Sequence, residues 1–151
     1  MKVYLATDHA GFELKEKVKE FLKNEGYEIE DMGAHQFDPQ DDYPDFIAKA
    51  AEAVSKDPEN NKAIIFGGSG QGEAMVANKF PGVRAVVFYG NMDIIPLSRE
   101  HNDANVLSLG GRFLTEDEAF EAVQTWLETP FTNEPRHSRR IEKIKKIETT
   151  L

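Results

Sequence analysis

Short apolar, β-prone runs alternate with helix-like segments along this chain, and this alternation limits the folds that it can adopt. The predicted strands are Lys2–Thr7, Tyr27–Glu30, Ala63–Phe66, Arg84–Phe88 and Asn105–Leu109. Apolar residues at helical spacing predict helices over Gly11–Glu25, from Pro44 to Val54, and over Glu73–Phe80, Asp93–His101, Glu116–Glu128 and Pro135–Glu148. Strands joined by helices pair in parallel through right-handed crossovers. The sequence therefore predicts an α/β fold with an open, parallel, five-stranded sheet and helices on both faces.

A chain of 151 residues is long enough for one domain with a real core, and ten Phe, four Tyr and one Trp supply large buriable side chains. No linker or internal repeat divides it, so we expect a single domain over residues 1–151. No run of about eighteen apolar residues exists, which argues against a membrane span, and the N-terminus lacks the pattern of a signal peptide. We expect a cytoplasmic protein. Because there is no cysteine, disulfides, cysteine-ligated zinc and thiol catalysis are excluded.

The charge of the chain is unevenly distributed. The net charge is −9, to which residues 136–151 contribute +4 and the rest of the chain −13. An acidic body argues against general nucleic-acid binding, which needs a basic face. The basic tail needs an explanation of its own.

A glycine-rich loop, Gly67-Gly68-Ser69-Gly70-Gln71-Gly72-Glu73, joins the third predicted strand to a helix. Its closely spaced glycines expose backbone N–H groups that favour an anion. The dinucleotide-binding fingerprint and the P-loop both fail at Glu73, where a glycine or a lysine is needed. The loop therefore suits a small developing negative charge with a carboxylate beside it. Taken alone, Glu73 could equally serve the helix dipole, and Ser69 could be a simple turn residue.

Two other polar clusters follow predicted strands, and a third precedes one. Asp8-His9 and Gly110-Gly111-Arg112 lie at strand carboxyl ends, where ligands bind in open α/β sheets. His101-Asn102-Asp103 lies between a predicted helix and a strand. Helix capping by Asp8 or His9, and a polar helix end at His101, are the alternative explanations.

The basic tail contains Arg136 and Arg140, four residues apart and so on one helical face. Two guanidinium groups there favour an anion between them, and arginine suits the bidentate geometry of a phosphate. A solvated surface explains them about as well. The apolar stripe Ile141, Ile144 and Ile147 needs a surface to pack on, and a second subunit would provide one. No metal-ligand spacing occurs among the histidines, so we expect no metal.

Seven ordered motifs resemble those of the type B ribose-5-phosphate isomerases, a family that includes galactose-6-phosphate and allose-6-phosphate isomerases. They are DHAG at 8–11, DYPD at 42–45, GGSGQGE at 67–73, ANKFPGVRA at 77–85, SREHNDANVL at 98–107, GGR at 110–112 and RHSRR at 136–140. The resemblance covers nearly the whole chain. It implies a Rossmann-like fold, a homodimer or tetramer with shared active sites, and aldose–ketose isomerisation through an enediolate without a cofactor or metal.

The resemblance also implies roles for individual residues. One branch of the family uses a cysteine at the start of the glycine loop as base, which here is Gly67; the other uses a glutamate, here Glu73. In the glutamate branch Ser69 and the loop N–H groups would stabilise the enediolate, and Asp8 would help His101 open the sugar ring. The substrate-binding residues would be His9, Gly68, Gly70, Gly72, Asn102, Arg112, Arg136, His137 and Arg140.

The substrate itself is less narrowly predicted. Residues 89–96 do not match any branch well, and they could change the width of the sugar pocket. The glutamate branch favours ribose 5-phosphate. The alternatives are a six-carbon sugar phosphate, either allose 6-phosphate or galactose 6-phosphate, and a non-catalytic sugar-phosphate sensor. A nucleotide-binding regulatory domain is disfavoured by the failed fingerprints.

Overall fold

The computed structural model describes all residues, 1–151, and its centre is a five-stranded sheet. The strands are β1 (Lys2–Thr7), β2 (Glu28–Asp31), β3 (Asn61–Gly67), β4 (Ala85–Phe88) and β5 (Val106–Gly110). Their order in the sheet is β2-β1-β3-β5-β4, and every neighbouring pair is parallel. The predicted open parallel sheet is therefore confirmed, and all five carboxyl ends lie at one edge.

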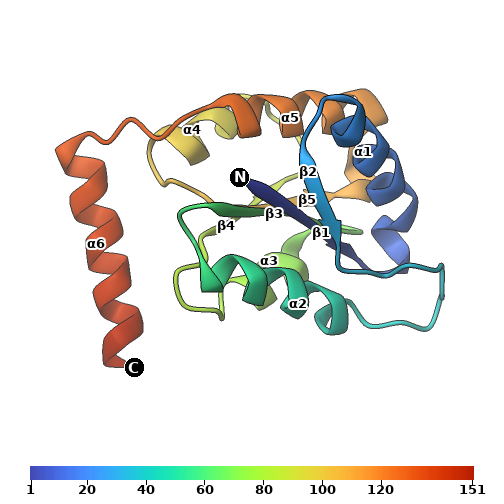
Figure 1. Cartoon of the computed structure of the whole chain (residues 1–151), viewed down its shortest axis with the longest axis horizontal. Helices are drawn as coiled ribbons and strands as arrows, with labels where there is room; N and C mark the ends of the chain where they lie inside the picture. Colours follow the sequence, from blue (N-terminus) through green and yellow to red (C-terminus); the bar gives the residue numbers. More distant parts are fainter.

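Helices cover both faces of this sheet, as predicted. They are α1 (Phe12–Asn24), α2 (Tyr43–Lys56), α3 (Gln71–Ala77), α4 (Ile94–Glu100), α5 (Glu116–Glu128) and α6 (Pro135–Thr150), with short 3-10 turns at His9–Gly11 and Gly111–Phe113. In Figure 1, α2 and α3 lie below the sheet and α1, α4 and α5 lie above it. None of these helices has the length and apolar character needed to cross a bilayer.

Two apolar cores fill the space between the sheet and its helices. On β3, Ile64 and Phe66 face one core, which includes Trp126 of α5. Ala63 and Ile65 face the other, with the apolar side of α2. This alternation follows from the two-residue period of a strand. A central strand buried on both faces explains why residues 63–66 read as a continuous apolar run.

Several boundaries differ from their predictions by one to three residues, and the start of α3 is the difference that bears on the site. Helix α3 begins at Gln71, two residues before the predicted start. Gly70 precedes it with φ of +80°, a left-handed conformation that glycine adopts without strain. The turn therefore closes earlier than the glycine spacing suggests, and it places Glu73 in the first turn of the helix.

Helix α6 stands apart from the layered body, at the left of Figure 1. Its contacts are with segments that precede strands: the Glu148 carboxylate accepts a hydrogen bond from the backbone N–H of Gly82, just before β4. Ile141 is buried, but Ile144 and Ile147 are 45% and 59% exposed. The predicted helix is present at the amino ends of the strands, and two of the three residues of its apolar stripe remain uncovered.

Candidate active site

Glu73 is buried at the carboxyl end of β3, with 4% of its surface exposed. Its carboxylate lies directly over the backbone of Gly67, so closely that any side chain at position 67 would collide with it. The polar edge of the sheet therefore contains a carboxylate that is almost removed from water.

The surroundings of Glu73 favour its protonated form more than water does. Burial, helped by the nearby Asp8 carboxylate, raises the pKa of Glu73, and backbone hydrogen bonds from Glu73 and Gly70 offset only part of that effect. A carboxyl group whose pKa is raised toward neutrality is a better proton acceptor and donor at physiological pH.

The glycine loop is held rigidly around this carboxylate. Ser108 of β5 donates a hydrogen bond of 2.7 Å to the carbonyl oxygen of Gly70. The Ser69 hydroxyl accepts one of 3.3 Å from the Gln71 backbone N–H. Gly72 lies against the Tyr43 hydroxyl, which leaves no space for a side chain there. Tyr43 thus packs against the glycine loop at Gly72. The DYPD motif contains Tyr43 but does not indicate this contact.

Asp8 and His9 follow β1 at the same edge. Asp8 is 6% exposed, and its Oδ1 accepts a 2.9 Å hydrogen bond from the Ala10 backbone N–H, so the capping explanation for Asp8 is correct. His9 Nδ1 lies 2.7 Å from Asp41 Oδ1. Asp41 comes from the long polar loop before α2, and nothing in the sequence spacing points to it.

Arg112 places a cation beside the loop. Its guanidinium packs against Gly68, where an added side chain would come within about 3 Å of it. Arg112 is exposed and makes no ion pair. The poorly matched residues 89–96 begin at this edge too, because the Tyr89 ring lies 6.0 Å from that of Phe113.

Asp8, His9 and Asp41 bring three potential metal-ligand atoms within 4.8 Å of one another. The Nδ1 of His9 and an oxygen of Asp41 are already hydrogen-bonded to each other, and Asp8 caps a turn. We therefore assign no metal to this cluster.

A second group of predicted site residues lies around the start of α6. The rings of His101 and His137 stack with their centroids 4.3 Å apart. Burial, and then the neighbouring His101 and Arg136, lower the pKa of His137. Arg136 and Arg140 are both exposed, and Arg140 has no ion-pair partner. The tail therefore presents two guanidinium groups beside a pair of stacked imidazoles.

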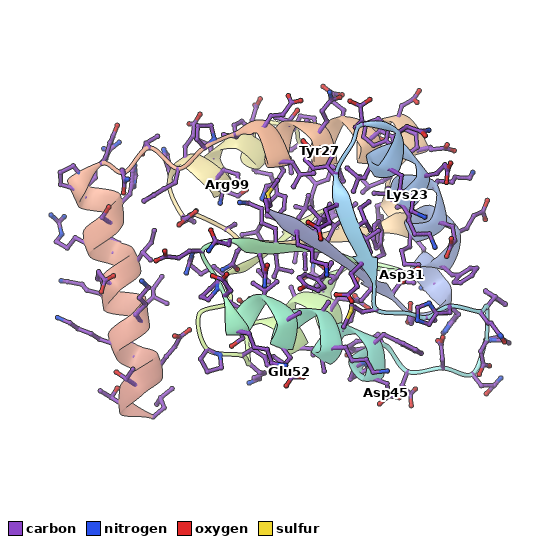
Figure 2. The ribbon with its side chains drawn as sticks, viewed as in Figure 1. Lys23, Tyr27, Asp31, Asp45, Glu52 and Arg99 are labelled. Atoms are coloured by element: carbon purple, nitrogen blue, oxygen red, sulfur yellow. The ribbon has the colours of Figure 1, made fainter.

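Two arginines hold the turn that carries His101 and Asn102. The Nε of Arg84 donates to the carbonyl oxygens of Asn102 and Asp103, at 3.1 and 3.0 Å. Arg99, labelled in Figure 2, donates to the Ala104 carbonyl at 2.7 Å and to Asp103 Oδ1 at 2.8 Å. The exposed Asn102 side chain is thus displayed from a fixed backbone.

The two groups lie at opposite ends of the strands. His101 and Asn102 precede β5, whereas Gly110 and Arg112 end and follow it. A strand rises about 3.3 Å per residue, so the five residues of β5 separate the groups by on the order of 15 Å. A single chain therefore brings Glu73, Ser69, Asp8, His9 and Arg112 together. It does not bring His101, Asn102, Arg136, His137 and Arg140 to them.

Comparisons with known proteins agree across the whole chain. A family model described as Ribose/Galactose Isomerase matches residues 3–144. Ribose-5-phosphate isomerase B of Mycobacterium tuberculosis is 43% identical over 150 residues, covering 99% of this chain and 91% of that protein.

Solved structures are similar over the same extent. Ribose-5-phosphate isomerase B of Mycoplasma genitalium, solved with bound ribulose-5-phosphate, has a TM-score of 0.96 at 37% identity and covers 99% of this chain and 97% of that one. The Clostridium thermocellum ribose-5-phosphate isomerase B has a TM-score of 0.92 at 45% identity, with 99% of both chains covered.

Proposed function

The chain belongs to the ribose/galactose isomerase family and is an aldose–ketose isomerase that interconverts ribose 5-phosphate and ribulose 5-phosphate; we propose that Glu73 transfers the proton in this reaction. The observation that carries this proposal is the burial of Glu73 over Gly67 at the carboxyl edge of the sheet. Its raised pKa suits a group that must take up a proton and then return it.

The proton transfer uses only the substrate and this carboxyl group. The Glu73 carboxylate removes the proton from C2 of the open-chain aldose, and the electron pair moves through the C1–C2 bond to the aldehyde oxygen. The resulting enediolate loses the proton of its C2 hydroxyl while the C1 oxygen gains one. Protonated Glu73 then returns its proton to C1, which leaves the ketone at C2. The step balances without an oxidant or a reductant.

The glycine loop supplies the stabilisation of the enediolate. Ser69 and the backbone N–H groups of Gly70 and Gly72 belong to the same loop as Glu73, and fixed donors near a developing oxyanion lower the barrier. The rigid loop, held by Ser108, keeps those donors in place before the charge develops. Gly68 lets the guanidinium of Arg112 approach the loop closely.

We further propose that a complete site combines two copies of the chain. One copy supplies the carboxyl-edge group with Glu73, and the other supplies His101 and Asn102 for ring opening and hydroxyl binding. The phosphate then lies between Arg112 and His9 of one copy and Arg136, His137 and Arg140 of the other.

The exposed surface supports assembly into a homodimer. Strand β4 is an edge strand, and the helices beside it expose Met75 by 65%, Ile94 by 40% and Leu97 by 43%. Ile144 and Ile147 of α6 are exposed as well, and large exposed apolar side chains are candidates for contacts with another protein chain. A second copy would cover these side chains, and pairing of dimers would give a tetramer.

The isomerase assignment is tested with purified protein, EDTA and two substrates. We expect rapid formation of the ketose from ribose 5-phosphate and slow turnover of allose 6-phosphate. Turnover of the hexose phosphate alone would keep the chemistry and change the substrate. Binding of both sugars without turnover would favour the sensor and contradict the role of Glu73.

The shared site is tested by subunit complementation. Glu73→Gln and His101→Asn each disable a different half of the site, so each variant alone should be nearly inactive. Mixed and re-equilibrated chains form heterodimers with one intact site of two. Random pairing of equal amounts predicts recovery of about a quarter of wild-type activity. No recovery, with exchange of chains confirmed by mass spectrometry, would contradict a site built from two copies.

A further inference from the structure

One carboxylate outside the roles described above holds His9. Asp41 Oδ1 lies 2.7 Å from His9 Nδ1 and also accepts a 2.9 Å hydrogen bond from the His9 backbone N–H. A single oxygen therefore fixes both the backbone and the ring of His9. The Asp41 side chain is only 8% exposed, whereas that of His9 is 31% exposed. Asp41 thus lies behind His9, away from solvent.

His9 is the only hydrogen-bond partner of the Asp41 carboxylate. Its second oxygen, Oδ2, is buried and has no hydrogen-bond partner. A buried carboxylate needs compensation, and an imidazolium supplies a positive charge as well as an N–H donor. The charged groups that face His9 are Asp8, Asp41 and Arg112. The hydrogen bond to Asp41 raises the pKa of His9 against the opposing effects of burial and Arg112.

The orientation of His9 is fixed as well. With Nδ1 engaged by Asp41, Nε2 is the ring nitrogen left for a ligand. Phe37 packs edge-on against the imidazole, with centroids 6.4 Å apart, and Phe12 packs against Phe37 at 6.3 Å. The ring is therefore confined, with its remaining donor at the edge of the sheet that carries Arg112.

Asp41 lies in the loop between β2 and α2, and this loop is anchored at both ends. Beyond β2, the backbone N–H of Ala34 donates to the Thr7 carbonyl oxygen at 2.8 Å, and the buried Lys15 donates to the Ala34 carbonyl oxygen at 2.6 Å. At its other end, Asp41 is two residues from Tyr43, where α2 begins. The loop begins directly after Asp31, the last residue of β2, which is labelled in Figure 2. Anchoring at both ends gives Asp41 a defined position next to β1.

We propose that Asp41 is a positioning residue for substrate binding, which holds His9 as an imidazolium whose Nε2–H donates to the phosphate of the sugar. This inference rests on the proposed function, in which His9 and Arg112 bind the phosphate. Asp41 itself does not touch the substrate.

The test compares Asp41→Asn with Asp38→Asn. Both changes remove one negative charge from the same loop and retain a side-chain acceptor oxygen. Asp38 is exposed, and its Oδ1 accepts only from the Gln40 backbone N–H at 2.9 Å, so it is the matched control. The pKa of His9 is measured from its ring-proton NMR signal, assigned with His9→Gln. The kinetic constants on ribose 5-phosphate are measured from about pH 5.5 to about pH 8.5.

In Asp41→Asn we expect the pKa of His9 to fall and KM to rise about tenfold, the usual cost of a lost charge-assisted hydrogen bond, with kcat changed by less than about twofold. The KM ratio of variant to wild type should be largest between the two measured His9 pKa values. It should shrink at lower pH, where His9 is protonated in both proteins. The ionisation of the substrate phosphate cancels from this ratio. Asp38→Asn should change neither quantity.

Three results would overturn the inference. An unchanged His9 pKa in Asp41→Asn would show that the pair does not control protonation. A fallen pKa with an unchanged KM would show that His9 charge plays no part in binding. A KM penalty that is the same at every pH would indicate a purely structural role. If wild type does not isomerise ribose 5-phosphate at all, the proposed function fails, and the NMR titration still reports on the pairing separately.

Discussion

Replacing Gly67 with alanine should disable the site while preserving the fold, because the Glu73 carboxylate occupies the space that a side chain at position 67 would fill. A Cβ built on Gly67 lies closer than 3.0 Å to the terminal carbon and both oxygens of Glu73, whereas ordinary contacts begin at 3.4 Å. The carboxylate must then withdraw by about 1 Å, and a misplacement of that size costs about 100-fold in rate. We expect kcat on ribose 5-phosphate to fall about 100-fold. KM should change little, because the proposed phosphate ligands lie elsewhere.

The assay follows ketose formation under saturating substrate, and circular dichroism with urea unfolding checks the fold. Overpacking by one methyl group should lower the free energy of unfolding by about 1–3 kcal/mol, which a stable domain tolerates. Glu73→Gln provides the control through a double-mutant cycle. If Gly67→Ala acts by displacing the carboxylate, it should add little to the loss already caused by Glu73→Gln. A Gly67→Ala variant with near wild-type kcat, or full additivity of the two losses, would refute this reasoning.

Three further predictions concern the base, the tail and the buried lysine. Glu73→Gln should lower kcat by about 100-fold or more. Folding raises the pKa of Glu73, so ionisation of Glu73 lowers the stability of wild type as the pH rises through that pKa. In urea titrations, Glu73→Gln should therefore be more stable relative to wild type at pH 8 than it is below the ordinary carboxyl pKa of 4.5. Arg140→Ala should raise the inhibition constant of inorganic phosphate about tenfold, while the adjacent exposed Arg139→Ala should not; equal inhibition of both would contradict the phosphate role. Lys15→Met should lower the free energy of unfolding by about 3 kcal/mol, because it removes a buried ion-pair partner of the Asp31 carboxylate. Lys19 is more exposed, so Lys19→Met should lower the free energy of unfolding by about 1 kcal/mol or less.

The fold was predictable because most of its signals are local. Four of the five strands contain apolar runs, the exception being β2 with the sequence EIED, and the helices carry apolar stripes, so these segments show their period without knowledge of what they pack on. The end of α1 was predictable for the same reason, since Gly26 follows it with φ of +87°. The start of α3 was not, because the left-handed turn at Gly70 depends on its hydrogen bond from Ser108, a residue 38 positions away.

The sequence motifs name the candidate site residues, and the structure shows how these residues are grouped within one chain. The motifs identify Glu73 and its loop, since glycine spacing and a nearby carboxylate are visible in the sequence. They do not identify Asp41, whose contact with His9 spans 32 positions and arises only because the loop folds back beside β1. They also do not show that His101 and Glu73 lie at opposite ends of β5. That separation follows from the parallel topology together with the position of His101 before β5, and the motifs taken one by one do not show it.

The separation of the base from the tail arginines has an electrostatic consequence. A guanidinium held next to Glu73 would favour its carboxylate form and lower the pKa that burial raises, which would weaken it as a proton carrier. Within one chain this pairing is prevented, because Arg136 and Arg140 lie at the far end of the strands. In the proposed dimer the arginines of one copy would approach the other copy's site, and binding of the substrate phosphate would neutralise their charge there. In such a dimer the basic tail of one copy would meet the acidic body of the other, which would give the uneven charge of the sequence a role in pairing.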